Sequence, residues 1–259
     1  MLMVGLFALV RYLESMGVFF PSRKMAVSPS VMGLPWEDIY FETKDNVTLN
    51  AWFFKNPQAR STVIFAHGNA GNMSDRLFKV KFFHDLGLNV FIFDYRGYGK
   101  SQGRPTEAGV YLDAQGAYDY LQTRHDVQMK NIVLYGASIG GVVVIDLATH
   151  RDAALLVVES SITNAQDMAR IIYPFVPSIF LSLKFDSINK VRTLKIPKLF
   201  IHSPDDEVVP YWVGQKLFEA ASQPKEFLKI HGGHNDGSIT VDPPAAGEFI
   251  RILKARDLI

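Results

Sequence analysis

Residues 131–141 read Asn-Ile-Val-Leu-Tyr-Gly-Ala-Ser-Ile-Gly-Gly. The apolar run Ile132–Tyr135 has the length of a buried strand, and the pattern of Val142–Ala148 predicts a helix. Ser138 lies on the sharp turn between them. So tight a turn leaves no room for side chains two residues to either side, and glycine occupies both places, as Gly136 and Gly140. Ser138 is therefore the candidate nucleophile.

The bulk composition limits what the protein binds. With 259 residues, 48% of them hydrophobic, the chain can bury one large core. Lysine and arginine number 27 against 26 acidic residues, a balance too even to attract nucleic acid or an anionic membrane electrostatically. The chain has no cysteine, which excludes disulfides, thiolate metal ligands and a cysteine nucleophile. No metal-ligand spacing is present, so we expect neither metal nor cofactor, and a small-molecule partner rather than nucleic acid.

The first ten residues, Met1–Val10, are apolar, and Arg11 and Glu14 then interrupt the run. Ten residues are too few to span a bilayer, which needs about 20, and no secretory cleavage pattern follows. One interpretation is a helix that lies on the domain or on a partner. The other is an interfacial helix, extending to Phe20, that docks on a bilayer or a lipid-like substrate, or the remnant of an anchor. The location thus stays open between cytoplasmic and peripherally membrane-associated.

The rest of the chain alternates strands and helices. Residues 1–35 are expected to form an apolar helix and a connector, and residues 36–259 a single domain. A hairpin is predicted first, from Ile39–Thr43 and Leu49–Phe54. The later strands are predicted at Thr62–Ala66, Asn89–Phe93, Ile132–Tyr135, Leu155–Glu159, Lys198–His202 and Glu226–Ile230. Helices are predicted between them, the first capped by Ser74 and the last starting near Pro244. Such alternation indicates a mostly parallel sheet, with ligands beyond the carboxyl ends of its strands.

A serine hydroxyl needs a histidine to take its proton and a carboxylate to orient that histidine. When the serine lies on a strand–turn–helix elbow, the chain order is serine, acid, histidine. This order excludes His67, His84 and His125, which precede the serine. His231 and His234 follow the last strand. We favour His234, which lies farther into the loop; His231 is expected to be a polar strand end bonded to backbone.

The acid is expected on the loop after Lys198–His202. That loop reads Ser-Pro-Asp-Asp-Glu from Ser203, and Asp206 is the first candidate, with Asp205 second and Asp186 a distant third. An alternative is that these carboxylates only cap the helix that follows, where the helix dipole favours negative charge.

Acyl transfer also needs hydrogen-bond donors for the oxyanion. One is expected to be the Ile139 N–H, just after the nucleophile. The other is expected from the loop that begins at His67, as the Asn69 N–H, with Gly68 permitting the loop conformation. His67 itself has a purely structural alternative, an imidazole bonded to nearby backbone.

Together these motifs resemble the α/β-hydrolase superfamily, from about Ile39 to the C-terminus. The segments that carry the resemblance, besides Ser138, are His67–Asn72, Asp94–Ser101, Asp206–Pro210 and Gly233–Asp236. The first two look like a branch of small hydrolases that includes the ABHD-type depalmitoylases and bacterial membrane-associated members. The resemblance implies an eight-stranded, mostly parallel sheet, a small helical cap, ester or thioester hydrolysis, and Asp206 and His234 as the partners of the serine. Ser203-Pro204 departs from the family, which commonly has glycine there.

The class of substrate is inferred from residues 160–197, the connection in which relatives carry a cap. This connection is modest and contains the apolar stretches Ile171–Pro177 and Ile179–Leu181, which indicate a lipid-like or short-to-medium acyl ester. The alternative is that they pack a small flap onto the core and never contact substrate. The sequence thus favours a carboxylesterase or thioesterase over an amidase or a non-catalytic, membrane-tethered binding protein.

Overall fold

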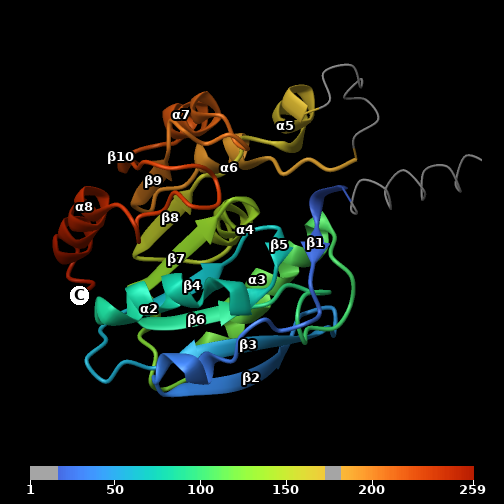
Figure 1. Ribbon diagram of the computed structural model, residues 1–259, viewed down its shortest axis with the longest axis vertical. Coiled ribbons are helices and arrows are strands. Elements are labelled where there is room, and N and C mark those ends of the chain that lie inside the picture. The colour runs from blue at the N-terminus through green and yellow to red at the C-terminus, as the bar shows by residue number, and fades with distance from the viewer. Residues whose placement is uncertain (1–16, 173–181) are drawn as a thin grey trace, which may run out of the picture.

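A mixed sheet of eight strands forms the centre of the computed structural model, which describes residues 17–172 and 182–259 (Figure 1). The strand order is β10-β9-β8-β7-β4-β6-β3-β2, parallel from β10 to β6 and antiparallel at β3 and β2. The bounds are β2 Trp36–Glu42, β3 Thr48–Phe54, β4 Thr62–Ala66, β6 Asn89–Phe93, β7 Ile132–Ala137, β8 Leu155–Glu159, β9 Lys198–His202 and β10 Lys225–Lys229. The predicted eight-stranded, mostly parallel sheet is therefore confirmed.

Helices cover both faces of this sheet (Figure 1). Those described are α2 Leu77–Asp85, α3 Glu107–Gln122, α4 Ile139–Ala148, α5 Ala165–Ile172, α6 Ser187–Val191, α7 Tyr211–Ala220 and α8 Pro243–Lys254. α2 and α8 pack on one face, and α3, α4, α6 and α7 pack on the other. Because both faces are covered, the central strands are continuous apolar runs without polar alternation.

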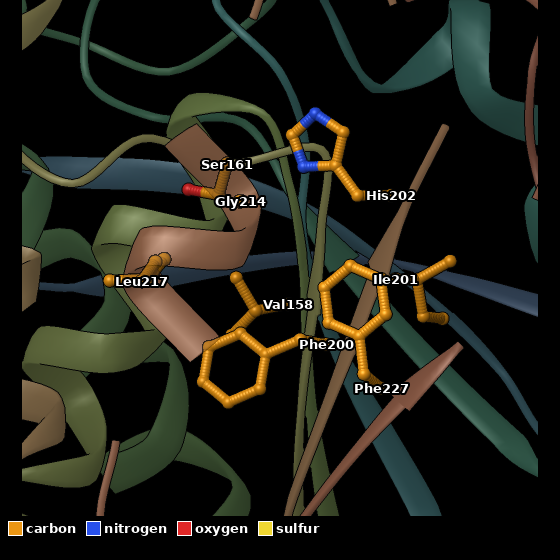
Figure 2. Close-up of a pocket in the computed structure, with 8 residues that line it drawn as sticks. All are labelled: Val158, Ser161, Phe200, Ile201, His202, Gly214, Leu217 and Phe227. Atoms are coloured by element: carbon orange, nitrogen blue, oxygen red, sulfur yellow. The ribbon is translucent and has the colours of Figure 1, made fainter. Parts of the chain in front are cut away.

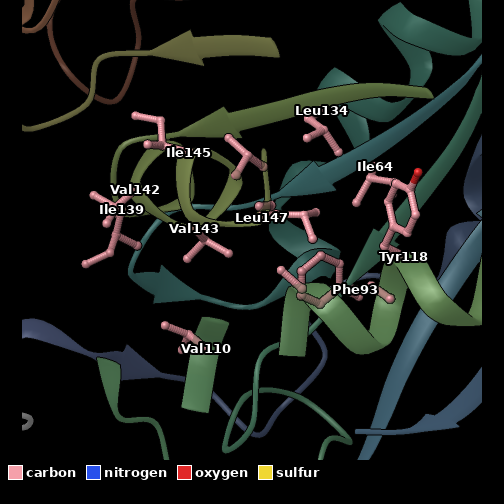
Figure 3. Packing of buried hydrophobic residues seen from close by; sticks show 14 of the residues in the cluster. Ile64, Phe93, Val110, Tyr118, Leu134, Ile139, Val142, Val143, Ile145 and Leu147 are labelled. Atoms are coloured by element: carbon pink, nitrogen blue, oxygen red, sulfur yellow. The ribbon is translucent and has the colours of Figure 1, made fainter. Parts of the chain in front are cut away.

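Side chains of β4 show how the core divides. Val63 and Phe65 join the cluster under α2 and α8, whereas Ile64 points to the cluster under α3 and α4. Figure 3 shows this second cluster, in which Val142 and Val143 of α4 pack beside the sheet. Each fully buried side chain of this size contributes about 1.5–3 kcal/mol. The nucleophile turn is thus held between a buried strand and a buried helix.

The helix predicted after Ser74 starts differently from the prediction. A 3₁₀ turn, Met73–Arg76, comes first, and its N-cap is Asn72. The Asn72 side chain accepts a hydrogen bond from Ser74 N–H at 2.9 Å, and Asp75 Oδ2 accepts one from Asn72 N–H at 2.9 Å. This reciprocal capping box needs an acid three residues after the cap, which Asn72 has and Ser74 lacks.

The connector before the domain pairs with the loop after β4. The short strand β1 (Phe20–Pro21) runs parallel to β5 (Ala70–Gly71). The Phe20 N–H donates to the Asn69 carbonyl at 2.9 Å, so this part of the connector touches the predicted oxyanion loop. The predicted apolar helix Met1–Val10 lies outside the described residues. The interfacial alternative extended that helix to Phe20, and this end of it is wrong, because Phe19 is buried in the core and Phe20 is in β1. In the part of the chain that the structure describes, no helix is both long and apolar enough to cross a bilayer.

Residues 160–197 contain α5 and α6. α6 packs against α4 and α7, which joins it to the main domain. Most of the predicted apolar lip, residues 173–181, lies outside the described residues. Ile172, just before that stretch, is exposed. The small cap and the division at residue 35 therefore stay predictions.

Candidate active site

The turn between β7 and α4 has the geometry that the glycine spacing predicts. α4 begins at Ile139, and Ser138 has φ 55° and ψ −121°. The Ser138 N–H donates to the Glu159 carbonyl of β8 at 2.8 Å. A Cβ on Gly136 would lie 2.2 Å from the Gly140 carbonyl oxygen, and one on Gly140 would lie 2.0 Å from a backbone oxygen of β4. Glycine is therefore needed at both positions.

The positive φ of Ser138 predicts that the turn is strained. A non-glycine residue in this conformation destabilises the folded state by about 1–3 kcal/mol. Glycine avoids this strain, but it also makes the unfolded chain more flexible, which offsets part of the gain. A Ser138→Gly variant is therefore expected to be more stable than Ser138→Ala by about 1 kcal/mol, or roughly 2–4 °C in Tm. Thermal unfolding of the two variants measures this, and equal Tm values would count against strain at the turn.

The structure brings Ser138, Asp206 and His234 together. His234 Nε2 lies 3.1 Å from Ser138 Oγ, and His234 Nδ1 lies 2.8 Å from Asp206 Oδ2. The serine follows β7, the acid follows β9 and the histidine follows β10, so all three lie at the carboxyl edge of the sheet. With Nδ1–H donating to the carboxylate, Nε2 is left to accept the serine proton. This arrangement suits nucleophilic attack by Ser138.

The Asp206 carboxylate is buried and accepts several hydrogen bonds from the protein. Its Oδ1 accepts hydrogen bonds from Val208 N–H at 3.0 Å and Val209 N–H at 2.7 Å. His202 Nε2 lies 3.5 Å from Oδ2. Burial alone would raise the pKa of Asp206, but the hydrogen bonds from His202 and His234 outweigh it and lower the pKa below its usual value. Asp206 is thus ionised at neutral pH, ready to stabilise a histidinium.

This environment predicts the effect of Asp206→Asn. Loss of the charge is expected to lower kcat roughly 10⁴-fold.

The lowered pKa of Asp206 also predicts a pH-dependent stability. The ionised carboxylate stabilises the fold above its unfolded pKa of about 3.9, and this contribution is lost as the pH falls through the folded pKa. The stability difference between wild type and variant is therefore expected to be larger at about pH 7 than at about pH 3. Urea unfolding at both pH values tests it, and a constant difference would contradict it.

The other candidate acids lie elsewhere. Asp205 is exposed, and its N–H donates to Ser203 Oγ at 3.1 Å. Asp186 pairs with the Asn189 side chain at 3.0 Å. Pro210, not an acid, is the N-cap of α7, so the alternative in which these carboxylates cap that helix is wrong.

The other histidines near the sheet edge have different partners. His231 is exposed, and its Nδ1 lies 2.9 Å from Asp242 Oδ2, so the prediction that its ring is bonded to backbone is wrong. His202 is buried, with Nε2 2.8 Å from the Val209 carbonyl as well as near Asp206. The support that His202 gives to the acid was not foreseen, although its place at the end of β9, four residues before Asp206, was a usable signal.

The predicted oxyanion loop runs beside the nucleophile. A Cβ on Gly68 would lie 3.7 Å from Ser138 Cβ. Ile139 is the first residue of α4, so its N–H has no partner within the helix. The Asn69 N–H has no acceptor among residues 17–172 and 182–259. Both N–H groups are thus available, and their role as oxyanion donors stays a prediction.

Residues of the Asp94–Ser101 segment hold this loop in place. Tyr98 Oη donates to the Asn69 carbonyl at 2.6 Å, and Tyr95 Oη donates to the His67 carbonyl at 2.8 Å. His67 is buried, and its Nδ1 lies 2.7 Å from the Gly68 carbonyl oxygen. Its Nε2 lies 3.2 Å from Asp94 Oδ1 but makes no hydrogen bond with the described residues. The ring hydrogen bond of His67 thus goes to backbone, as the structural alternative predicts. In the sequence this segment was recognised only through the family resemblance, and its role in positioning the oxyanion loop was not predicted.

Comparisons with known proteins agree with this geometry. The family described as serine aminopeptidase, S33, matches residues 57–187. The human alpha/beta hydrolase domain-containing protein 17B is 36% identical over 203 residues, which cover 77% of this chain and 67% of that protein. The chain belongs to the ABHD-type α/β-hydrolases. An uncharacterized protein of Mycobacterium tuberculosis is 35% identical over 223 residues, covering 85% of this chain and 79% of that protein.

A solved structure has the same fold. The Pyrococcus furiosus esterase Pf2001 matches with a TM-score of 0.77 and 24% identity, covering 92% of this chain and 97% of that chain. The family match and the human relative confirm the resemblance to the α/β-hydrolase superfamily, and with it that the protein is a hydrolase.

Two pockets of this ABHD-type hydrolase lie near the acid and the nucleophile. Figure 2 shows an interior one between β8, β9 and α7, where Phe200, Leu217 and His202 meet with no room left for a water molecule. This pocket is a small packing gap behind the loop that carries Asp206, not a binding site. The other is open and contains the nucleophile; it is lined by Phe65, Gly68, Asn69, Ala70, Arg76, Phe78, Lys79, Ala137, Ser138, His234, Asn235, Gly237 and Ser238. Among the described residues, no group of three or more His, Asp or Glu side chains could hold a metal ion.

Proposed function

We propose that this hydrolase cleaves carboxylic esters or thioesters through an acyl-enzyme on Ser138. The observation that carries the proposal is the continuous hydrogen-bonded chain from Ser138 Oγ through the His234 ring to Asp206. It supplies a nucleophile, a base and a charge that orients the base, without a cofactor.

In this mechanism His234 Nε2 takes the hydroxyl proton as Ser138 Oγ attacks the ester carbonyl. The oxyanion is stabilised by the N–H groups of Asn69 and Ile139, and His234 then gives the proton to the departing alcohol or thiol. Water repeats the sequence on the acyl-enzyme and releases the acid. Asp206 remains ionised and stabilises the histidinium in both halves.

The proposed substrate is a lipid-like or short-to-medium acyl ester. Phe78 gives the pocket apolar surface, since this residue is 50% exposed and open to an acyl chain. The Pyrococcus furiosus relative is an esterase, in line with this substrate class. Contact of residues 1–16 with a membrane surface belongs to the same proposal; it stops short of Phe19, which is buried, and of Phe20, which is in β1.

Amide hydrolysis is the alternative, since the matching family is described as serine aminopeptidase. An aminopeptidase must hold the positively charged α-amino group of its substrate, which a carboxylate does best. The described residues that line the pocket include no carboxylate, and they include the cations Arg76 and Lys79. The pocket therefore favours esters over peptides with a free amino terminus.

A substrate series tests the proposal. The full chain and a form without residues 1–16, which keeps β1, are assayed with p-nitrophenyl esters and acyl thioesters of increasing chain length and with amino-acid p-nitroanilides. We expect ester and thioester turnover that Ser138→Ala abolishes, and little anilide turnover. Preference for anilides would establish the amidase alternative, and no turnover of any substrate would favour a binding protein.

Membrane contact is tested on the same two forms with phospholipid vesicles. The proposal expects the shortened form to sediment less with the vesicles. Equal sedimentation and equal long-chain activity would contradict an interfacial role for the first residues.

A further inference from the structure

One wall of the catalytic pocket is basic. Arg76, at the end of the 3₁₀ turn, and Phe78 and Lys79, in α2, line the pocket that also contains Ser138 and His234. Among the described lining residues, none is acidic. The pocket therefore combines an exposed aromatic ring with two cationic groups on adjacent turns.

The charge of Lys79 is already compensated. The ammonium group donates to Glu159 Oε1 and, at 2.9 Å, to Tyr135 Oη, and Tyr135 Oη donates to Glu159 Oε2 at 2.7 Å. Lys79 is 6% exposed and Glu159 2%. This closed network pairs the buried ammonium with a buried carboxylate, so it offers little attraction to a substrate anion.

Arg76 has no such partner. Its Nη2 donates to the Ala70 carbonyl at 2.7 Å, and no carboxylate of the described chain lies within 4.0 Å of its guanidinium. The preceding residue, Asp75, has Oδ2 turned to the Asn72 N–H. A guanidinium has five N–H donors, so most of those of Arg76 remain available. Ala70 directly follows Asn69, which places this cation beside the predicted oxyanion loop.

We propose that this pocket selects esters that carry an anionic group, which Arg76 binds while Phe78 packs against the apolar part. The proposal rests on the ester hydrolase function proposed above and adds a substrate class to it. A planar guanidinium with parallel N–H groups matches a carboxylate or phosphate, and no carboxylate of residues 17–172 and 182–259 competes for it. The anion belongs to either the acyl half or the alcohol half of the substrate.

Three aryl esters of similar size distinguish these cases. p-Nitrophenyl butyrate is neutral, p-nitrophenyl hemisuccinate carries a carboxylate on the acyl half, and 3-carboxy-4-nitrophenyl butyrate carries it on the leaving group. Full-length wild type, Arg76→Gln and Arg76→Lys are compared by kcat and KM. Lys81→Gln is the matched control, because Lys81 lies in α2, which directly follows Arg76, but is exposed, paired with Asp85 at 2.9 Å and outside the pocket lining.

We expect Arg76→Gln to raise KM about tenfold for one of the two anionic esters and less than twofold for the neutral ester. Arg76→Lys is expected to keep part of the affinity, and Lys81→Gln to behave as wild type. The ester that is affected identifies the half that carries the anion. Equal changes on neutral and anionic esters, or none on any, would overturn the anion site. Turnover that survives Ser138→Ala would instead overturn the ester hydrolase function itself.

Discussion

Ser138→Ala is expected to lower kcat/KM for ester hydrolysis by roughly 10⁶-fold, because it removes the atom that becomes acylated. The serine hydroxyl makes its contact with His234 at 3.1 Å, whereas the bond from its N–H to the Glu159 carbonyl does not involve the side chain. The variant should therefore fold normally. Steady-state kinetics with p-nitrophenyl butyrate measure the loss, and circular dichroism with thermal unfolding checks the fold. A folded variant that retains one hundredth or more of the activity would contradict the role of Ser138.

His234→Ala is expected to cause a loss of similar size, roughly 10⁵–10⁶-fold in kcat, because the serine then has no base. His231 provides the matched control. It lies in the same loop, is exposed and pairs with Asp242, the N-cap of α8. His231→Ala is expected to change kcat less than twofold. Both variants are assayed on the same ester, and a large loss in His231→Ala with a small one in His234→Ala would reverse the assignment.

The strands were the most predictable part of the fold. β4, β6, β8 and β9 begin and end at the predicted residues. Each is buried on both faces, so its apolar run ends where the chain leaves the sheet, and the limits are visible in the sequence. The start of the helix after β4 was less predictable, because two adjacent polar residues, Asn72 and Ser74, could each cap it. Which of the two is the N-cap depends on Asp75, whose carboxylate accepts a hydrogen bond from the backbone N–H of Asn72 and not of Ser74.

The three residues proposed for catalysis could be predicted because the order of serine, acid and histidine follows from the elbow. The residues that support them could not, since their contacts join segments far apart in the sequence. Tyr98 reaches the Asn69 carbonyl across 29 positions, and Lys79 reaches Glu159 across 80. The motif that contains Tyr98 was noticed as a resemblance, yet nothing in the sequence says what its hydroxyl binds.

The connector is a second feature that local pattern did not indicate. β1 has only two residues, too short for any periodicity, and its partner β5 is equally short. Their pairing is parallel and brings the Phe20 N–H to the Asn69 carbonyl. Only the folded arrangement places the residues after the apolar N-terminus against the loop proposed to bind the oxyanion.

The central claim is that Ser138 is a nucleophile activated by His234. Reaction with a fluorophosphonate, followed by mass spectrometry of the intact chain and of its peptides, tests it most directly. We expect one adduct per chain, on the peptide that contains Ser138, formed much more slowly in His234→Ala and absent in Ser138→Ala. An adduct on another residue, or ester turnover by a chain whose Ser138 is fully modified, would contradict the claim.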